Sequence, residues 1–281
     1  MHTDLVKKVR YTIAIAAGKG GVGKSSVAVN LALCLAKKKY SVGIVDADIY
    51  GPSFSRMLPT SEDMRVSREN PEQMLPFSSL GIKAISVSYI RKEGEGLFVR
   101  APIANGFIGE LLDNVDWGEL DFLLVDFPPG TGDIQLTIMQ KMVFSGALIV
   151  TTPQEVALMD VRKATEMFHR SHVAVLGVVE NMSYFEEPVS KRKYYPLGRG
   201  GGKKISKEFG VPFLGEIPLD PHISACGDEG KSLFSCVPDS GAALAYQELS
   251  SQVVDHLYEL EQAEVRCKKH FDFAWEIKDV N

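Results

Sequence analysis

A glycine-rich segment directly after an apolar run constrains the fold of this chain more than any other feature. Residues 11–16 read YTIAIA, the segment AGKGGVGKSS follows, and residues 24–38 carry apolar side chains at helical spacing. Gly18–Ser25 matches G-x-x-x-x-G-K-[ST] between a predicted strand and a predicted helix, which is the context that a phosphate-binding loop requires. Glycines let backbone amides turn toward phosphate oxygens, and the helix N-terminus adds positive charge. The segment therefore predicts a nucleotide site.

The side chains of this loop predict separate roles. Lys24 would reach the β- and γ-phosphates of ATP, and the Ser25 hydroxyl would hold Mg²⁺. Lys19 is an additional cation; it is either a solvated loop lysine or, as we expect, a group that reaches the nucleotide of a partner subunit as an arginine finger does. A loop with this lysine resembles the deviant Walker A superfamily, which includes MinD, ParA and the nitrogenase iron protein. The residues expected to contact nucleotide are Gly18, Lys19, Gly20, Gly21, Val22, Gly23, Lys24, Ser25 and Ser26.

Apolar runs alternate with helical periodicity along the chain. Runs that are apolar at every position belong to central strands of parallel sheets, which helices cover on both faces. The pattern predicts one doubly wound α/β domain over residues 1–263 and a C-terminal tail over 264–281, with residues 59–80 as a surface loop. The expected strands are 11–16, 42–45, 82–87, 122–125, 147–150, 173–179 and 213–217, and the expected helices are 24–38, 101–115, 133–144, 155–169, 203–209 and 240–261.

Composition disfavours several classes of protein. Of the 281 residues, 45% are hydrophobic and 24% charged, as in ordinary globular domains. A formal net charge of −5 is unfavourable for general nucleic-acid binding, and no apolar run approaches the ~20 residues of a membrane span. The sequence shows no secretory signal, and its four cysteines, without close pairing, suit a reducing compartment. We expect a cytoplasmic protein that binds neither membrane nor nucleic acid.

Carboxylates follow two of the predicted strands. Asp46 and Asp48 lie at the strand end in IVDADIYGPS, and Asp126 ends the strand in LLVDFPPGTGD. Ligands of such sheets bind at the carboxyl ends of the strands, so these side chains are expected to face the nucleotide. Asp126 is a Walker B carboxylate that would hold Mg²⁺ through water. Asp48 would orient the attacking water, and Asp46 would support Mg²⁺ or the loop geometry.

Five segments together resemble the Mrp/ApbC group of iron–sulfur cluster carrier ATPases: DADIYGPS, DFPPGTGD, TTPQEVALMDVRKA, ENMSYF and FLGEIPLDP. The resemblance runs from about Tyr11 to about Phe234. It implies a Mg²⁺-dependent, slow ATPase that works as a homodimer around its nucleotides and passes clusters to apo iron–sulfur proteins or assembly factors. It also implies that Asn181 contacts adenine, with Pro218 and its loop beside it. From the residues alone, Asn181 is a polar group at a strand end, typical of a cap or turn.

The resemblance breaks at one motif. Members of the group typically carry C-x-x-C after NMSYF, and two such motifs across a two-fold axis supply four thiolates for one [4Fe–4S] cluster. The aligned positions here are Glu187 and Ser190, whose oxygens suit a soft cluster poorly. Cys226 and Cys236, which lie downstream on either side of GDEGKSLF, are the candidate ligands that remain, since Cys34 falls within the predicted helix after the loop. The alternative interpretation makes both cysteines small, partly buried apolar side chains.

Two other functions stay open at this stage. Without a cluster, the protein would be an ATPase switch or scaffold that acts on a protein partner, as MinD and ParA relatives do. The basic segment 191–204 is either a nucleic-acid-facing patch or, as its neighbouring glutamates favour, a solvated loop. In the tail, Phe271, Phe273, Trp275 and Ile277 alternate along the chain, which is strand periodicity and predicts packing on the domain or on a partner.

Overall fold

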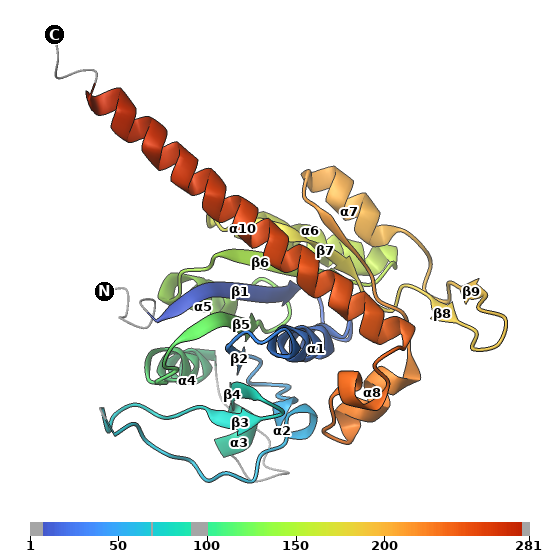
Figure 1. Ribbon diagram of the computed structural model, residues 1–281, viewed down its shortest axis with the longest axis horizontal. Helices are drawn as coiled ribbons and strands as arrows, with labels where there is room; N and C mark the ends of the chain where they lie inside the picture. The colour runs from blue at the N-terminus through green and yellow to red at the C-terminus, as the bar shows by residue number, and fades with distance from the viewer. Residues whose placement is uncertain (1–7, 69, 91–100, 277–281) are drawn as a thin grey trace.

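The fold centres on one eight-stranded sheet. The structure is a computed structural model that describes residues 8–68, 70–90 and 101–276. Its strands run in the order β10-β7-β6-β1-β5-β2-β4-β3 (Figure 1), and all neighbours are parallel except β3 and β4. The strands are β1 Val9–Ala17, β2 Val42–Asp46, β3 Phe77–Ser79, β4 Ile82–Ser86, β5 Leu120–Asp126, β6 Gly146–Thr151, β7 Val175–Glu180 and β10 Phe213–Glu216.

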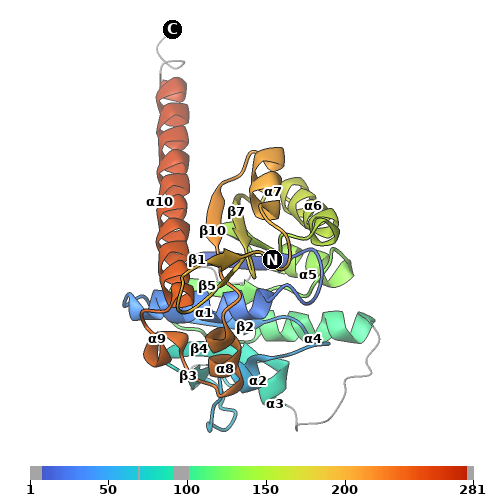
Figure 2. The same ribbon diagram turned by 90° about the vertical axis from the view of Figure 1, so that its right-hand side faces the viewer.

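Helices cover both faces of this sheet, as Figure 2 shows. One face packs against α1 and α10, and the other packs against α4, α5, α6 and α7. The principal helices are α1 Lys24–Lys37, α4 Ala101–Asp113, α5 Asp133–Lys141, α6 Glu155–Arg170, α7 Gly201–Phe209 and α10 Gly241–Glu276. None of the described helices is both long and apolar enough to span a bilayer. The predicted doubly wound α/β fold is confirmed.

Strand β1 shows why the apolar runs have no polar alternation. Ile13 and Ile15 point into the layer of α1 and α10, whereas Ala14 and Ala16 point into the layer of α4, α5 and α6. All four are buried, and full burial of one isoleucine side chain stabilises a fold by roughly 1.5–3 kcal/mol. A strand with helices on both faces is therefore apolar at most of its positions, with no regular polar alternation.

Several short elements were absent from the sequence prediction. They are α2 Phe54–Met57, α3 Val87–Ile90, β8 Phe185–Glu186, β9 Lys193–Tyr194, α8 Pro221–Asp228 and α9 Leu233–Cys236. The segment 59–80 is largely irregular as predicted, although it ends in β3 and forms a bridge between Val66 and Met74. Elements of two to eight residues depend on tertiary contacts more than on periodicity, which explains why the pattern missed them.

The tail differs from its prediction. Helix α10 continues to Glu276, so Phe271, Phe273 and Trp275 are helical and the predicted strand periodicity is wrong there. Ile277 lies outside the described residues. The first turns of α10 are anchored by buried apolar side chains such as Leu249 and Val253. Extending an anchored helix costs far less than nucleating one, and residues 258–276 are rich in good helix formers. Figures 1 and 2 show α10 reaching beyond the sheet.

The segment between β7 and α7 begins after Glu180, and its far end comes back into contact with Glu180. Glu180, the last residue of β7, is fully buried. One carboxylate oxygen accepts a hydrogen bond from Ser183 Oγ at 2.6 Å, and the other accepts from the backbone N–H of Gly202 at 2.6 Å. Gly202 lies so close that a Cβ there would approach Glu180 Cβ to 3.0 Å. The buried carboxylate therefore holds both ends of the segment 181–202 at the carboxyl end of β7.

Candidate nucleotide site

The carboxyl ends of the central strands place the predicted site residues together. Asp46 at the end of β2 is in register with Asp126 at the end of β5. On the other side, Ile15 of β1 is also in register with Asp126, and the phosphate loop begins directly after β1. Ligands of open parallel sheets bind in the crevice outside these strand ends. The order of the strands thus brings the loop and both carboxylates to one place.

The glycines of the loop meet different structural requirements. Gly21 and Gly23 have φ values of 81° and 77°, a left-handed conformation that other residues adopt only with strain. Gly18 is required by packing, because a Cβ there would lie 2.1 Å from the backbone carbon of Asp160 in α6. Gly20 lies in open space, because a Cβ added there would meet no other atom within 4 Å. The path of the loop therefore depends on glycine conformation at Gly21 and Gly23 and on close packing against α6 at Gly18.

Lys24 and Asp126 form a buried ion pair at the start of α1. The Lys24 ammonium donates to Asp126 Oδ1 and also lies 3.4 Å from Ser25 Oγ. Burial raises the pKa of Asp126, the ammonium of Lys24 and the Ser25 hydroxyl oppose this rise, and the Asp48 carboxylate adds to it. The second oxygen, Asp126 Oδ2, is buried and accepts no hydrogen bond within the described chain. This oxygen is available to a water molecule bound to Mg²⁺, so the donor set fits the predicted metal.

Asp46 supports the loop that carries Asp48. Its carboxylate accepts hydrogen bonds from the backbone N–H of Asp48 at 3.1 Å, that of Ser53 at 3.2 Å and the Ser86 hydroxyl at 2.9 Å. Burial raises the pKa of Asp46 to about 7, and the neighbouring charge of Asp126 contributes to the rise. These contacts agree with the loop-supporting alternative for Asp46. No sequence pattern indicated that Ser86, at the end of β4, would complete this arrangement.

Asp48 is half-buried and accepts a hydrogen bond from the backbone N–H of Gly51 at 3.2 Å. The charge of Asp48 contributes to the raised pKa of Asp126, so the two carboxylates interact electrostatically. Lys19 is also half-buried, and the structure shows no ion pair or hydrogen bond for its ammonium within the described residues. Lys19, which has no such contact among the described residues, is the residue predicted to act on the nucleotide of another subunit.

Asn181 lies against the phosphate loop. Its side-chain Nδ2 donates to the carbonyl oxygen of Val22 at 2.8 Å, and its backbone N–H donates to Thr151 at 2.7 Å. A Cβ at Gly23 would lie 2.3 Å from this Nδ2. Pro218 is buried, and its segment lies next to the one that follows Asn181, because the N–H of Leu219 donates to the carbonyl oxygen of Tyr184 at 2.7 Å. The structure therefore brings the two predicted base-side segments together beside the loop.

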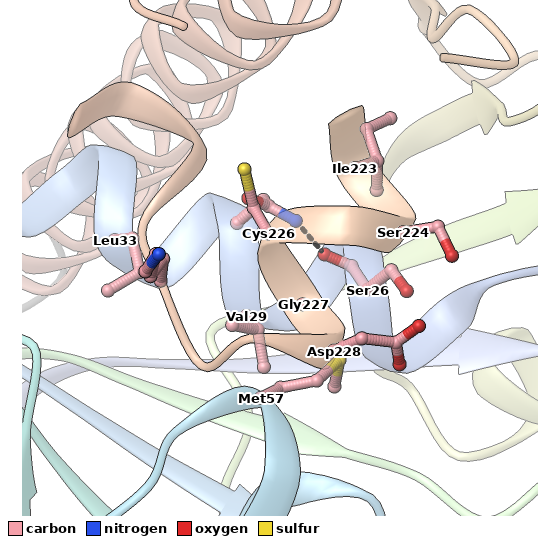
Figure 3. A pocket seen from close by; sticks show the side chains of 11 residues that line it. Ser26, Val29, Leu33, Met57, Ile223, Ser224, Cys226, Gly227 and Asp228 are labelled. Carbon is pink, nitrogen blue, oxygen red and sulfur yellow. Dashed lines mark hydrogen bonds between the residues drawn. The ribbon is translucent and has the colours of Figure 1, made fainter. Parts of the chain in front are cut away.

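A pocket of about 120 Å³ adjoins the end of the phosphate loop. Side chains of α1, including Ser26 and Val29, and of α8, including Cys226 and Asp228, line it together (Figure 3). Asn30, which also lines the pocket, donates from Nδ2 to the carbonyl of Ser26 at 2.8 Å. Sequence patterns identified Ser26 but not the α8 wall, because α8 is brought to α1 only by the tertiary fold.

Glu187 and Ser190, at the positions of the missing cysteines, form a tight turn. The Glu187 carboxylate accepts hydrogen bonds from the backbone N–H groups of Val189 and Ser190, the first at 3.0 Å. Its backbone N–H donates to Arg192 at 3.0 Å, which closes the hairpin of β8 and β9. The hydrogen bonds from Ser190 lower the pKa of Glu187. In this chain the two side chains build a β-hairpin.

Cys226 and Cys236 are brought together, whereas Cys34 is buried apart from them in α1. Burial raises the pKa of the Cys226 thiol to about 11, and the Cys236 thiol within hydrogen-bonding reach contributes. Cys236 is exposed. No group of three or more His, Cys, Asp or Glu side chains in the described residues could hold a metal ion within one chain. The described part of each chain therefore offers a pair of thiols, fewer than the four thiolates that one [4Fe–4S] cluster takes.

These features define a class. A doubly wound sheet, a glycine loop between β1 and α1, and a lysine paired with a carboxylate at the end of β5 are the parts of a P-loop nucleotide-binding protein. Comparison with known proteins then identifies the family. The family described as ParA: NUBPL iron-transfer P-loop NTPase matches residues 8–254, and this chain belongs to it.

The relatives are similar over most of the chain. The iron-sulfur cluster carrier protein of Synechocystis sp. is 45% identical over 251 residues, covering 88% of this chain and 71% of that protein. The iron-sulfur cluster transfer protein NUBPL of Mus musculus is 42% identical over 254 residues, covering 90% and 79%. A nucleotide-binding protein from Archaeoglobus fulgidus, solved in complex with ADP, has a TM-score of 0.71 and 38% identity over 85% of this chain and 96% of that one. The resemblance to iron–sulfur carrier proteins is confirmed.

The raised pKa of Asp46 predicts a pH dependence of stability in the nucleotide-free protein. The folded chain holds the proton of Asp46 more tightly than the unfolded chain, so the free energy of unfolding falls as pH rises from about 4 to about 7. Asp46→Asn should remove this contribution, at least about 1 kcal/mol between these pH values. Urea unfolding at both pH values measures the difference.

The matched control is Asp239→Asn, which changes an exposed carboxylate and should keep the wild-type pH dependence. Identical pH dependence in wild type and Asp46→Asn would contradict the raised pKa.

Proposed function

We propose that this protein binds and slowly hydrolyses ATP at Gly18–Ser26 and works as a homodimer. The observation that carries this proposal is the buried Lys24–Asp126 pair, whose Asp126 Oδ2 has no hydrogen-bond partner among the described residues. This pair lies beside a loop in which Gly21 and Gly23 adopt the left-handed conformation. In the nucleotide complex, Lys24 would turn its ammonium toward the phosphates. The Ser25 hydroxyl and Asp126 would hold Mg²⁺, which supplies positive charge to the phosphate oxygens when bound.

In this proposal, residues of both subunits would contribute to ATP hydrolysis at each site. Asp48 stands at the strand end on a loop held by Asp46, and it would orient the water that attacks the γ-phosphate. Lys19 would extend across the dimer axis and stabilise charge on the partner's nucleotide. Asn181, now bonded to Val22, and Pro218 beside it would contact the adenine base.

An in-trans role of Lys19 predicts complementation between two inactive variants. Lys19→Ala should lose turnover by about 10³-fold or more while retaining nucleotide binding. Lys24→Gln should lose nucleotide binding but keep Lys19. Mixed dimers then contain one complete site, with Lys24 from one chain and Lys19 from the other. An equal mixture should recover roughly a quarter of wild-type turnover, since half of the dimers are mixed.

The control for this experiment mixes Lys24→Gln with a Lys19→Ala/Lys24→Gln chain, which can form no complete site. Phosphate release measured at equal total protein gives the comparison. A mixture as inactive as its two components would place Lys19 in its own subunit's site or outside catalysis.

For the cargo, we propose that the dimer carries an iron–sulfur cluster and passes it to apo iron–sulfur proteins. The names of the relatives support this function, because those with 42–45% identity are called iron-sulfur cluster carrier or transfer proteins. The paired Cys226 and Cys236 support a ligand assignment, since two chains would supply the four thiolates of a [4Fe–4S] cluster. Glu187 and Ser190 take no part, because they are engaged in the hairpin turn.

Anaerobic reconstitution tests the cluster assignment. Wild-type protein should take up about four iron and four sulfide per dimer with visible absorption. The Cys226→Ser/Cys236→Ser variant should take up neither, while Cys34→Ser, which changes a buried thiol of α1, should behave as wild type. An undiminished cluster in the double variant would overturn the ligands.

A second candidate is an ATPase switch that acts on a protein partner without a cluster. One observation favours it: the segment that holds the cluster in relatives with C-x-x-C is here a hairpin closed by Glu187, with Val189 89% exposed near its tip. Failure of reconstitution in wild-type protein that still hydrolyses ATP would support this function over the carrier.

A further inference from the structure

The segment between α8 and α9 folds back so that its two cysteines meet. Helix α8 ends at Asp228, Gly230 follows at φ 64°, and the N–H of Lys231 donates to the carbonyl of Cys226 at 2.8 Å. The chain then enters α9, where the N–H of Cys236 donates to Ser232 at 3.1 Å. Helices α8 and α9 pack against each other, and the two thiols lie within hydrogen-bonding reach.

The surroundings of the two sulfurs differ in a way that suits thiol–disulfide exchange. Cys236 is exposed and open to a small reagent, whereas Cys226 is only 7% exposed and can be reached through Cys236. Exchange begins at the cysteine that a reagent can reach, and a second cysteine beside it can then resolve the mixed disulfide. Cys34 lacks this arrangement, because it is buried in α1 against Ser250, with its Sγ 3.3 Å from Ser250 Oγ.

We infer that Cys226 and Cys236 form a reversible intrachain disulfide in exchange with a low-molecular-weight disulfide. The Cys236 thiolate attacks one sulfur of the reagent, which breaks its S–S bond and releases one small thiolate. Cys226 then gives up its proton and attacks Cys236 Sγ, forming the protein S–S bond and releasing the second small thiolate. The protein loses two electrons and two protons, and the reagent is reduced to two thiols.

The bond would tie α8 to α9 beside the nucleotide site. Cys226 lines the same pocket as Ser26, the last residue of the phosphate loop region, so the oxidised form changes one wall of this pocket. The disulfide also leaves neither sulfur free to bind iron. The inference stands without the cluster proposal, because exchange requires only the two cysteines and the small disulfide.

Peptide mapping of the iron-free protein tests the inference directly. The protein is equilibrated with oxidised and reduced glutathione at several ratios, quenched with acid, alkylated and digested with trypsin. Cleavage after Lys231 separates Cys226 from Cys236, so their two peptides stay joined only by the proposed bond. We expect the joined pair, a loss of two hydrogen masses from the whole chain, and full return on adding a reductant. Cys34 should be alkylated only after unfolding.

Single variants distinguish the steps. Cys226→Ala should accumulate a glutathione adduct on Cys236, because the second attack is lost. Cys236→Ala should leave the buried Cys226 largely unmodified. Separate glutathione adducts on both cysteines of the wild-type protein, or a disulfide between two chains, would overturn the intrachain bond. Because no iron is present, a failed cluster reconstitution has no effect on this result.

Discussion

The ion pair between Lys24 and Asp126 is the interaction on which the nucleotide site depends. Both side chains are buried, and two charges removed from water are costly unless each has a partner. In the nucleotide-free chain they partner each other, while Asp126 Oδ2 is left without a hydrogen bond among the described residues. Under the proposed function these partners would be exchanged: phosphate would take the place of Asp126 beside Lys24, and a metal-bound water would take the place of Lys24 beside Asp126. The strand order β1-β5-β2 brings Lys24 and Asp126 together and places Asp46 beside them.

Much of this arrangement was predictable from residue patterns. The runs 11–16 and 122–125 are apolar at nearly every position, and the glycine loop and the aspartate follow them directly, so the position of the site at the strand ends required no further information. The apolar pattern could not show that Ser86 bonds to Asp46, that Asn181 bonds to Val22, or that α8 reaches α1. Each of these contacts joins segments far apart in the chain. In the tail the residue pattern was misleading. The alternating aromatic residues predicted strand periodicity, but the helix that is anchored on the sheet continues through them to Glu276.

The nucleotide site and the hairpin at the missing cysteine positions are physically separate. Glu180 holds both ends of the excursion 181–202, so the hairpin beyond it can change its side chains without disturbing β7. Glu187 and Ser190 at the cysteine positions leave the loop, Lys24 and Asp126 unaffected. The paired thiols of Cys226 and Cys236 lie on α8 and α9, next to the pocket that includes Ser26. Under the carrier proposal, the thiol chemistry of this chain therefore lies beside the pocket that Ser26 and Cys226 line, and not in the hairpin.

The most direct test of the central claim is the Mg²⁺ dependence of ADP binding, measured by isothermal titration calorimetry with and without the metal. If Asp126 exchanges Lys24 for a metal-bound water, Mg²⁺ should tighten ADP binding to the wild-type protein by about tenfold or more, a change of about 1.4 kcal/mol. Asp126→Asn, which keeps the side-chain shape, should bind ADP without this enhancement. An equal effect of Mg²⁺ on both proteins would show that Asp126 does not support the metal and would contradict the account.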